Sequence, residues 1–212
     1  MARSARGVET RLKIIQAAAD LFHRQGVNAT SPDEIIEASG TGKGQFYHYF
    51  KSKERLVHEV LQVYAEAIRS GAAPVEYDIR SWEDLERWFS AQVALQRRFG
   101  MTRGCPFGTI AGEVTEKDEL IRQDLNLIFE LVGNQIAAFF IREKAAGRMV
   151  EGVDERRLAE FCMAVAQGAM LVGKVKRDAA LVEVSFREAL AHLKAYAVKR
   201  RSPRGGGAPR GR

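Results

Sequence analysis

Residues 43–50 place polar and aromatic side chains at a spacing that suits contact with nucleic acid. Phe46, Tyr49 and Phe50 follow one another at i, i+3 and i+4, so in a helix they share one face that can be buried. The opposite face then presents a cation, an amide, a phenol and an imidazole, which belong to Lys43, Gln45, Tyr47 and His48. A cation binds phosphate, and the other three groups can hydrogen-bond to base edges. The pattern predicts a short helix at about 43–49 that lies in the major groove of DNA.

Another short helix is predicted immediately before this one. Ser31 is a favourable N-cap, and Glu34 completes a capping box with it. Gly40 and Gly42 bracket the turn that follows, since glycine adopts the left-handed backbone that a sharp corner requires. Helix, glycine turn and second helix together form a predicted helix-turn-helix at about 31–50.

This region closely resembles the signature of the TetR family of bacterial transcription regulators. The resemblance is carried by residues 40–54, which read GTGKGQFYHYFKSKE, and by the first-helix pattern of residues 14–22 that Gly26 ends. It covers about 8–68, and it is specific because a long pattern is combined with the expected order of helices.

Three positions depart from the family's pattern. Thr41 stands where the family usually has an apolar residue, and Gly42 stands where it often has a serine cap. Gln45 is bulkier than the usual small residue, which is expected to alter base preference. Glycine is an acceptable N-cap, so the turn is expected to form but to be less rigid.

The resemblance implies an all-α fold with two domains, and no strand pattern is convincing anywhere in the sequence. The first domain, at 8–68, is a three-helix helix-turn-helix DNA-binding domain. The second, larger domain, at 75–199, binds an effector and dimerises. The implied partners are a double-stranded DNA operator with an inverted repeat, a small-molecule effector and a second copy of the chain.

Eight residues are expected to contact DNA. Gln45, Tyr47 and His48 are expected to approach bases, although His48 has the alternative of being merely exposed to solvent. Phosphates are expected to be held by Thr30, Ser31, Lys43, Lys51 and Lys53.

The net charge of +6 comes from the C-terminal end of the chain. Seven of the 33 Lys and Arg residues lie within 194–212, which contains no acid. The remaining 26 basic residues face 27 Asp and Glu, so residues 1–193 carry a net charge of −1. The basic segment 200–212 has no apolar period and is predicted to be disordered. An alternative function follows from it, namely non-specific nucleic-acid binding through the tail.

The second domain is predicted to consist of helices at about 82–99, from Pro106, at 118–146, 155–177 and 182–200. Residues 161–173 are apolar on nearly all sides and rich in small residues, so this helix must be buried broadly. It is expected to contribute to a dimer interface, and the alternative is a core helix within one chain.

Cys105 is the most chemically suggestive residue of the second domain. It precedes Pro106 at a predicted helix start, and Arg103 lies two residues earlier, so the pKa of its thiol is expected to be lowered. In some TetR regulators with a similar Gly-Cys helix start, a cysteine senses oxidants or electrophiles. The alternative is a small buried filler, and Cys162, in an apolar helix, is expected to be inert.

Aromatic and methionine side chains of this domain are candidates for an apolar effector pocket, although most such residues are simply core. The candidates that accompany Cys105 are Trp88, Phe107, Phe129 and Met163.

Other classes of protein find little support in the sequence. The four histidines form no metal-binding spacing with the cysteines, and no phosphate loop or nucleophile elbow is present, so no metal or cofactor is expected. An all-α enzyme with an unrecognised site, such as a Cys105–His dyad, remains an alternative. Two cysteines suit a reducing cytoplasm, no signal peptide is expected, and no apolar run is expected to span a bilayer.

Overall fold

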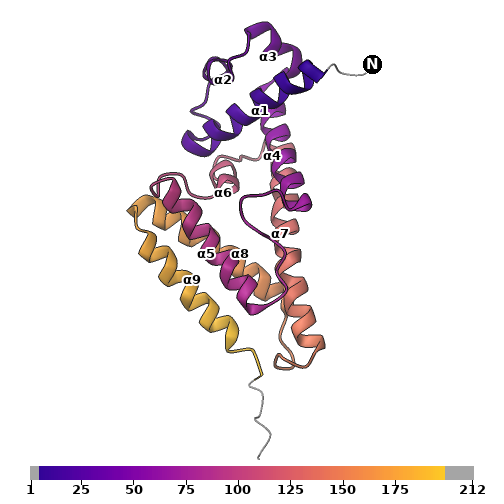
Figure 1. Ribbon diagram of the computed structural model, residues 1–212, viewed down its shortest axis with the longest axis vertical. Helices are drawn as coiled ribbons and strands as arrows, with labels where there is room; N and C mark the ends of the chain where they lie inside the picture. Colours follow the sequence, from indigo (N-terminus) through magenta and orange to yellow (C-terminus); the bar gives the residue numbers. More distant parts are fainter. Residues whose placement is uncertain (1–4, 199–212) are drawn as a thin grey trace, which may run out of the picture.

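The computed structural model describes residues 5–198, which form nine helices (Figure 1). The helices are α1 (Ala5–Gln25), α2 (Pro32–Ser39), α3 (Lys43–Tyr49), α4 (Lys53–Ser70), α5 (Trp82–Arg98), α6 (Pro106–Ala111), α7 (Glu119–Ala145), α8 (Glu155–Lys176) and α9 (Ala179–Lys194). Within these residues the fold is all-α, as predicted, apart from an isolated bridge between Met149 and Ala197. The predicted disordered tail, residues 200–212, lies outside the described residues.

The N-terminal helices form a small head in which α1 packs against α2, α3 and α4 (Figure 1). The capping box predicted for α2 is present: the Ser31 hydroxyl accepts from the Glu34 backbone N–H, and the Glu34 carboxylate accepts from the Ser31 N–H at 2.7 Å. Gly40 ends α2 with a φ of +63°, which explains the glycine at this corner. The core of the head includes Phe22, Ile35 and Phe46.

The larger helical domain is organised around α7, which contacts α4 on one side and α8 on the other. Helix α9 packs against both α8 and α5 (Figure 1). At the end remote from the head, Trp82 packs edge-on against Phe139 and Phe140 of α7.

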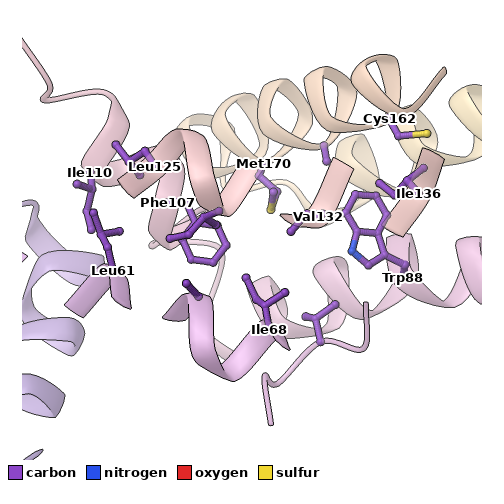
Figure 2. Packing of buried hydrophobic residues seen from close by; sticks show 14 of the residues in the cluster. Leu61, Ile68, Trp88, Phe107, Ile110, Leu125, Val132, Ile136, Cys162 and Met170 are labelled. Atoms are coloured by element: carbon purple, nitrogen blue, oxygen red, sulfur yellow. The ribbon is translucent and has the colours of Figure 1, made fainter. Parts of the chain in front are cut away.

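Helix α4 belongs to the cores of both domains. Its N-terminal half packs against α1, and its length lies along α7, so the buried cluster runs continuously from the head into the larger domain. Figure 2 shows Leu61 of α4 beside Ile110 of α6 and near Leu125 of α7. A movement of α4 relative to α7 must therefore disturb both cores, because protein interiors are close-packed.

Three predicted boundaries are corrected by the structure. The last helix occupies 179–194 rather than 182–200, because the Asp178 carboxylate accepts from the backbone N–H groups of Ala180 and Leu181 and starts the helix earlier. Beyond it the chain forms a turn at Ala195 and Tyr196, and the N–H of Val198 donates to the carbonyl of Arg148 at 2.9 Å. The first helix starts at Ala5, ahead of residue 8, where the predicted DNA-binding domain begins.

The expectation that no segment could span a bilayer is also corrected. By length and composition alone, α7 and α8 are long and apolar enough to cross a membrane. Both helices pack within the helical domain, where their apolar faces contact each other, α4 and α9. Core helices of this kind pass the same test as membrane helices, so it is weak evidence for a membrane protein.

Candidate DNA-binding surface, interdomain seam and effector cavity

Helix α3 divides into a buried aromatic face and an exposed polar face. Phe46 and Phe50 are buried in the core of the head, and Tyr49 is half-buried. Lys43, Gln45, Tyr47 and His48 are all exposed. The predicted separation of the two faces is confirmed. The four polar side chains lie on the surface, so none of them is buried in the apolar core of the head.

Gln45 has a local structural role that the sequence analysis missed. Its Oε1 accepts a hydrogen bond from the backbone N–H of Gly42 at 3.0 Å. Because Gly42 is an N-cap without a side chain, this bond supplies half of a capping box from the third helical position. The signal for this role in the sequence is a glutamine three residues after an N-cap. The amide nitrogen of Gln45 keeps its capacity to donate.

Two predicted phosphate ligands are instead used inside the head. Thr30 is 1% exposed, and its hydroxyl donates to the carbonyl of Gly26 at 2.6 Å. The ammonium of Lys53 donates to the carbonyls of Val27 and Thr30 at 2.9 and 3.3 Å. Both side chains hold the connection between α1 and α2, which corrects their assignment as free phosphate ligands. Ser31 and Lys51 are exposed.

A set of polar contacts, which we call the interdomain seam, joins the end of α1 to the segment just before α6. The carbonyl of Gly104 accepts from His23 Nε2 at 2.9 Å and from Gln96 Nε2 at 2.6 Å, while its N–H donates to Gln96 Oε1 at 2.9 Å. All these side-chain contacts are buried. Burial lowers the pKa of His23, so its neutral form donates this bond.

The seam has two further contacts nearby. Arg103 forms an ion pair with Asp20 of α1, and its guanidinium lies over the ring of Phe99 at 4.4 Å from the centroid. The carboxylate of Glu113 accepts from the backbone N–H of Asn28 at 2.7 Å. Gly26 lies beside it with a φ of +89°, a left-handed backbone that favours glycine, and a Cβ there would displace the Glu113 carboxylate.

A second polar link joins α4 to α7. The Asp124 carboxylate, which is buried, lies 2.7 Å from His58 Nδ1 and accepts from Gln62 Nε2 at 2.8 Å. The head is therefore fastened to the larger domain at two separate places, at the seam and along α4.

Beside the seam, helix α4 and the larger domain together enclose an apolar cavity of about 80 Å³. Four of the five predicted effector residues line it, namely Trp88, Cys105, Phe107 and Met163. Phe129 does not line this cavity but lines two other clefts, so its role in effector binding stays a prediction. Figure 2 shows Phe107, Trp88, Val132 and Met170 converging on this space from α6, α5, α7 and α8.

Cys105 lies at the N-cap of α6, as predicted, but the expected lowering of its pKa is wrong. Burial of the thiol raises its pKa, and this effect outweighs the backbone N–H groups at the helix start. Arg103 is directed to Asp20 instead. Gln167 Nε2 donates to the sulfur at 3.4 Å. Burial also raises the pKa of Cys162, to about 12, which agrees with the expected inertness.

Helices α8 and α9 leave apolar side chains on the surface of the single chain. Leu171 is 64% exposed and Val175 is 77% exposed, and Val172 and Val184 are also exposed. Among residues 5–198, no group of three or more His, Cys, Asp or Glu side chains could hold a metal ion.

A helix-turn-helix head fastened to a helical domain with its own cavity defines a DNA-binding regulator that can respond to a ligand. Residues 14–60 match the family described as bacterial regulatory proteins, tetR family, and residues 82–190 match the tetracyclin repressor-like C-terminal domain. Because the second match alone covers about half of the chain, the chain belongs to the TetR family of bacterial regulators.

Similar proteins support this membership along most of the chain. An uncharacterized HTH-type transcriptional regulator of Lactococcus lactis subsp. lactis, in the lacX 3′ region, is 26% identical over 182 residues, which cover 84% of this chain and 89% of that protein. The HTH-type transcriptional repressor DhaR of Mycobacterium sp. strain GP1 is 25% identical over 170 residues, with coverage of 79% and 84%. The crystal structure of a TetR-family regulator from Agrobacterium tumefaciens has a TM-score of 0.77 at 26% identity and covers 88% of this chain and 98% of that chain.

The class of function follows from the family. The chain is a DNA-binding transcriptional regulator that a ligand releases from DNA, and members of this family are not enzymes. Regulators of this family typically act as dimers on DNA operators.

The reactivity of the Cys105 thiol tests whether this side chain is buried. In a Cys162→Ala background, we expect Cys105 to react with a disulfide reagent such as dithiobis(nitrobenzoate) more slowly than the same thiol in denatured protein. Because burial disfavours the thiolate, the rate should rise to half its maximum at a pH above about 8.5, the ordinary value for cysteine. A midpoint below that value would contradict the environment described and restore the electrophile-sensor hypothesis.

Proposed function

We propose that the chain acts as a cytoplasmic homodimer that binds an inverted-repeat operator, represses transcription there, and leaves the operator when the cavity is occupied. The observation that carries this proposal is the division of α3 into a buried aromatic face and an exposed polar face. A two-fold dimer would present two such helices to successive major grooves on one side of the duplex.

The surfaces of α8 and α9 support the dimer. One face of α8 is buried in the chain's own core through Cys162, Ala166 and Met170. Its other face exposes Leu171 and Val175 to water. Exposure of these apolar side chains costs free energy, and their burial against a second copy of the chain would remove that cost. The two interpretations of this helix, core and interface, therefore apply to different faces.

On the operator, the exposed residues of α3 divide by chemistry. Gln45, Tyr47 and His48 approach base edges, because an amide, a phenol and an imidazole can donate and accept hydrogen bonds there. Phosphates are held by Lys43, Lys51 and Ser31. Lys43 is available for this role, since its ion pair with Asp33 spans 3.5 Å and both side chains are exposed.

The interdomain seam provides a route by which a ligand in the cavity releases the protein from the operator. The residue after Gly104 in the chain is Cys105, which lines the cavity, so a ligand that displaces the start of α6 also displaces the acceptor of His23. The head then changes its orientation through α1. A ligand can shift this equilibrium only by binding the released arrangement more tightly than the DNA-bound one.

The proposal is tested by selection of bound sequences from a random DNA pool at near-physiological salt, with full-length protein and with residues 200–212 removed. We expect a palindromic motif that survives removal of the tail, because recognition lies in α3. Absence of a motif, with binding that disappears together with the tail, would contradict the proposal and favour non-specific binding through the basic segment.

Two substitutions on α3 then separate base contacts from phosphate contacts. We expect Lys43→Ala to weaken binding to all sequences alike and to reduce the salt dependence by about one counterion. Gln45→Ala should instead change which base is preferred at one position of each half-site. Circular dichroism provides the control, because Gln45 also caps α3. An unchanged base preference in a folded Gln45→Ala protein would contradict the assignment.

A further inference from the structure

One polar atom in the wall of the cavity has no partner in the described part of the chain. The indole nitrogen of Trp88 is buried and makes no hydrogen bond within the described residues. The residue is 3% exposed and lies on α5, where it lines the cavity. In Figure 2 the ring nitrogen is on the side of the indole that faces Val132, whereas Ile136 and Cys162 lie on the other side. The unpaired N–H therefore lies on the side of the indole nearer to Val132, which also lines the cavity.

An unpaired buried donor is unusual enough to require an explanation. Most buried polar groups in proteins have a hydrogen-bond partner, since leaving one without a partner costs free energy. A phenylalanine would fill a similar volume without this cost. The N–H of Trp88 is thus a group whose natural partner is an acceptor atom on whatever occupies the cavity.

The rest of the lining restricts the charge of the occupant. None of the side chains that line the cavity is a carboxylate, an ammonium, a guanidinium or an imidazole. An ionised ligand would be buried there without a counter-charge, which is costly. The occupant must therefore be neutral.

The titratable residues of the lining reinforce this restriction. Burial raises the pKa of Tyr64 to about 12 and also raises that of Tyr77. Burial raises the pKa of the Cys105 thiol too. All three groups stay uncharged near neutral pH.

We propose that the cavity binds a small, neutral, mainly apolar molecule whose carbonyl-type oxygen accepts a hydrogen bond from Trp88 Nε1. The apolar body of the molecule contacts Phe107, Val132 and Met170, and no covalent bond forms. This inference names the class of effector and so rests on the proposed ligand-controlled function, although binding itself can be measured without DNA.

The test compares three probes of similar size that differ in one property. Cyclohexanone carries a carbonyl, methylenecyclohexane has the same shape without an acceptor, and cyclopentanecarboxylate carries a charge. Titration by calorimetry should show that the ketone binds about tenfold more tightly than the alkene, which is the effect of one good hydrogen bond. The carboxylate should bind more weakly than the ketone at pH 7.

Trp88→Phe removes the N–H but keeps an aromatic ring in the wall. In this variant we expect the ketone and the alkene to bind within about twofold of each other. Trp82→Phe is the matched control, because Trp82 packs against Phe139 and Phe140 and does not line the cavity. That variant should keep the preference of the parent protein for the ketone.

A second readout needs no variant and so does not depend on folding of Trp88→Phe. In a ¹⁵N-labelled wild-type protein, the indole N–H resonance of Trp88 should shift when cyclohexanone binds and shift less with methylenecyclohexane. The inference is overturned if none of the probes binds, if ketone and alkene bind equally to the wild type, if Trp88→Phe keeps the preference, or if the carboxylate binds best.

Failure of the proposed ligand-controlled function would give a different experimental result. If cyclohexanone binds with the expected dependence on Trp88 but leaves operator affinity unchanged, the chemistry of the cavity stands and the link between cavity and DNA release fails. If operator affinity falls as well, both stand.

Discussion

The carbonyl of Gly104 is the point on which the arrangement of the two domains depends. It accepts from His23 of the head and from Gln96 of the larger domain in a buried environment, so it cannot exchange either partner for water without cost. Its chain neighbour Cys105 forms part of the cavity wall. One peptide unit thus touches the head, the helical framework and the space where a ligand can bind.

The polar link between α4 and α7 determines how a displacement of the Gly104 carbonyl would move the head. Asp124 of α7 binds His58 and Gln62 of α4, in contacts separate from those of the seam. In the proposed release mechanism, α4 stays anchored along α7, and a displacement at the start of α6 rotates the head about that helix. The exposed polar face of α3 is carried with it, because α3 shares its core with α1. Coupling of this kind requires two arrangements of the seam, between which ligand and DNA choose.

Local features could be predicted from the sequence, while contacts between distant segments could not. The helix-turn-helix was predictable because Ser31, Glu34 and the two glycines act within a few residues of one another. By contrast, His23 and Gly104 are 81 residues apart, and nothing local indicates that they meet. The pKa of Cys105 was misjudged for the same reason: the sequence shows a helix start, whereas burial is set by residues elsewhere, including Gln167.

The central claim, that the seam connects DNA binding to the cavity wall, is tested most directly by amide hydrogen exchange with and without the selected operator. The N–H groups of Gly104 and Asn28 donate to Gln96 and Glu113 across or beside the seam, and Val150, which bonds to Tyr196, serves as a remote reference. We predict that operator binding changes exchange at Gly104 and Asn28 but not at Val150. Unchanged exchange at both seam positions, while amides of α2 and α3 become protected, would contradict the account.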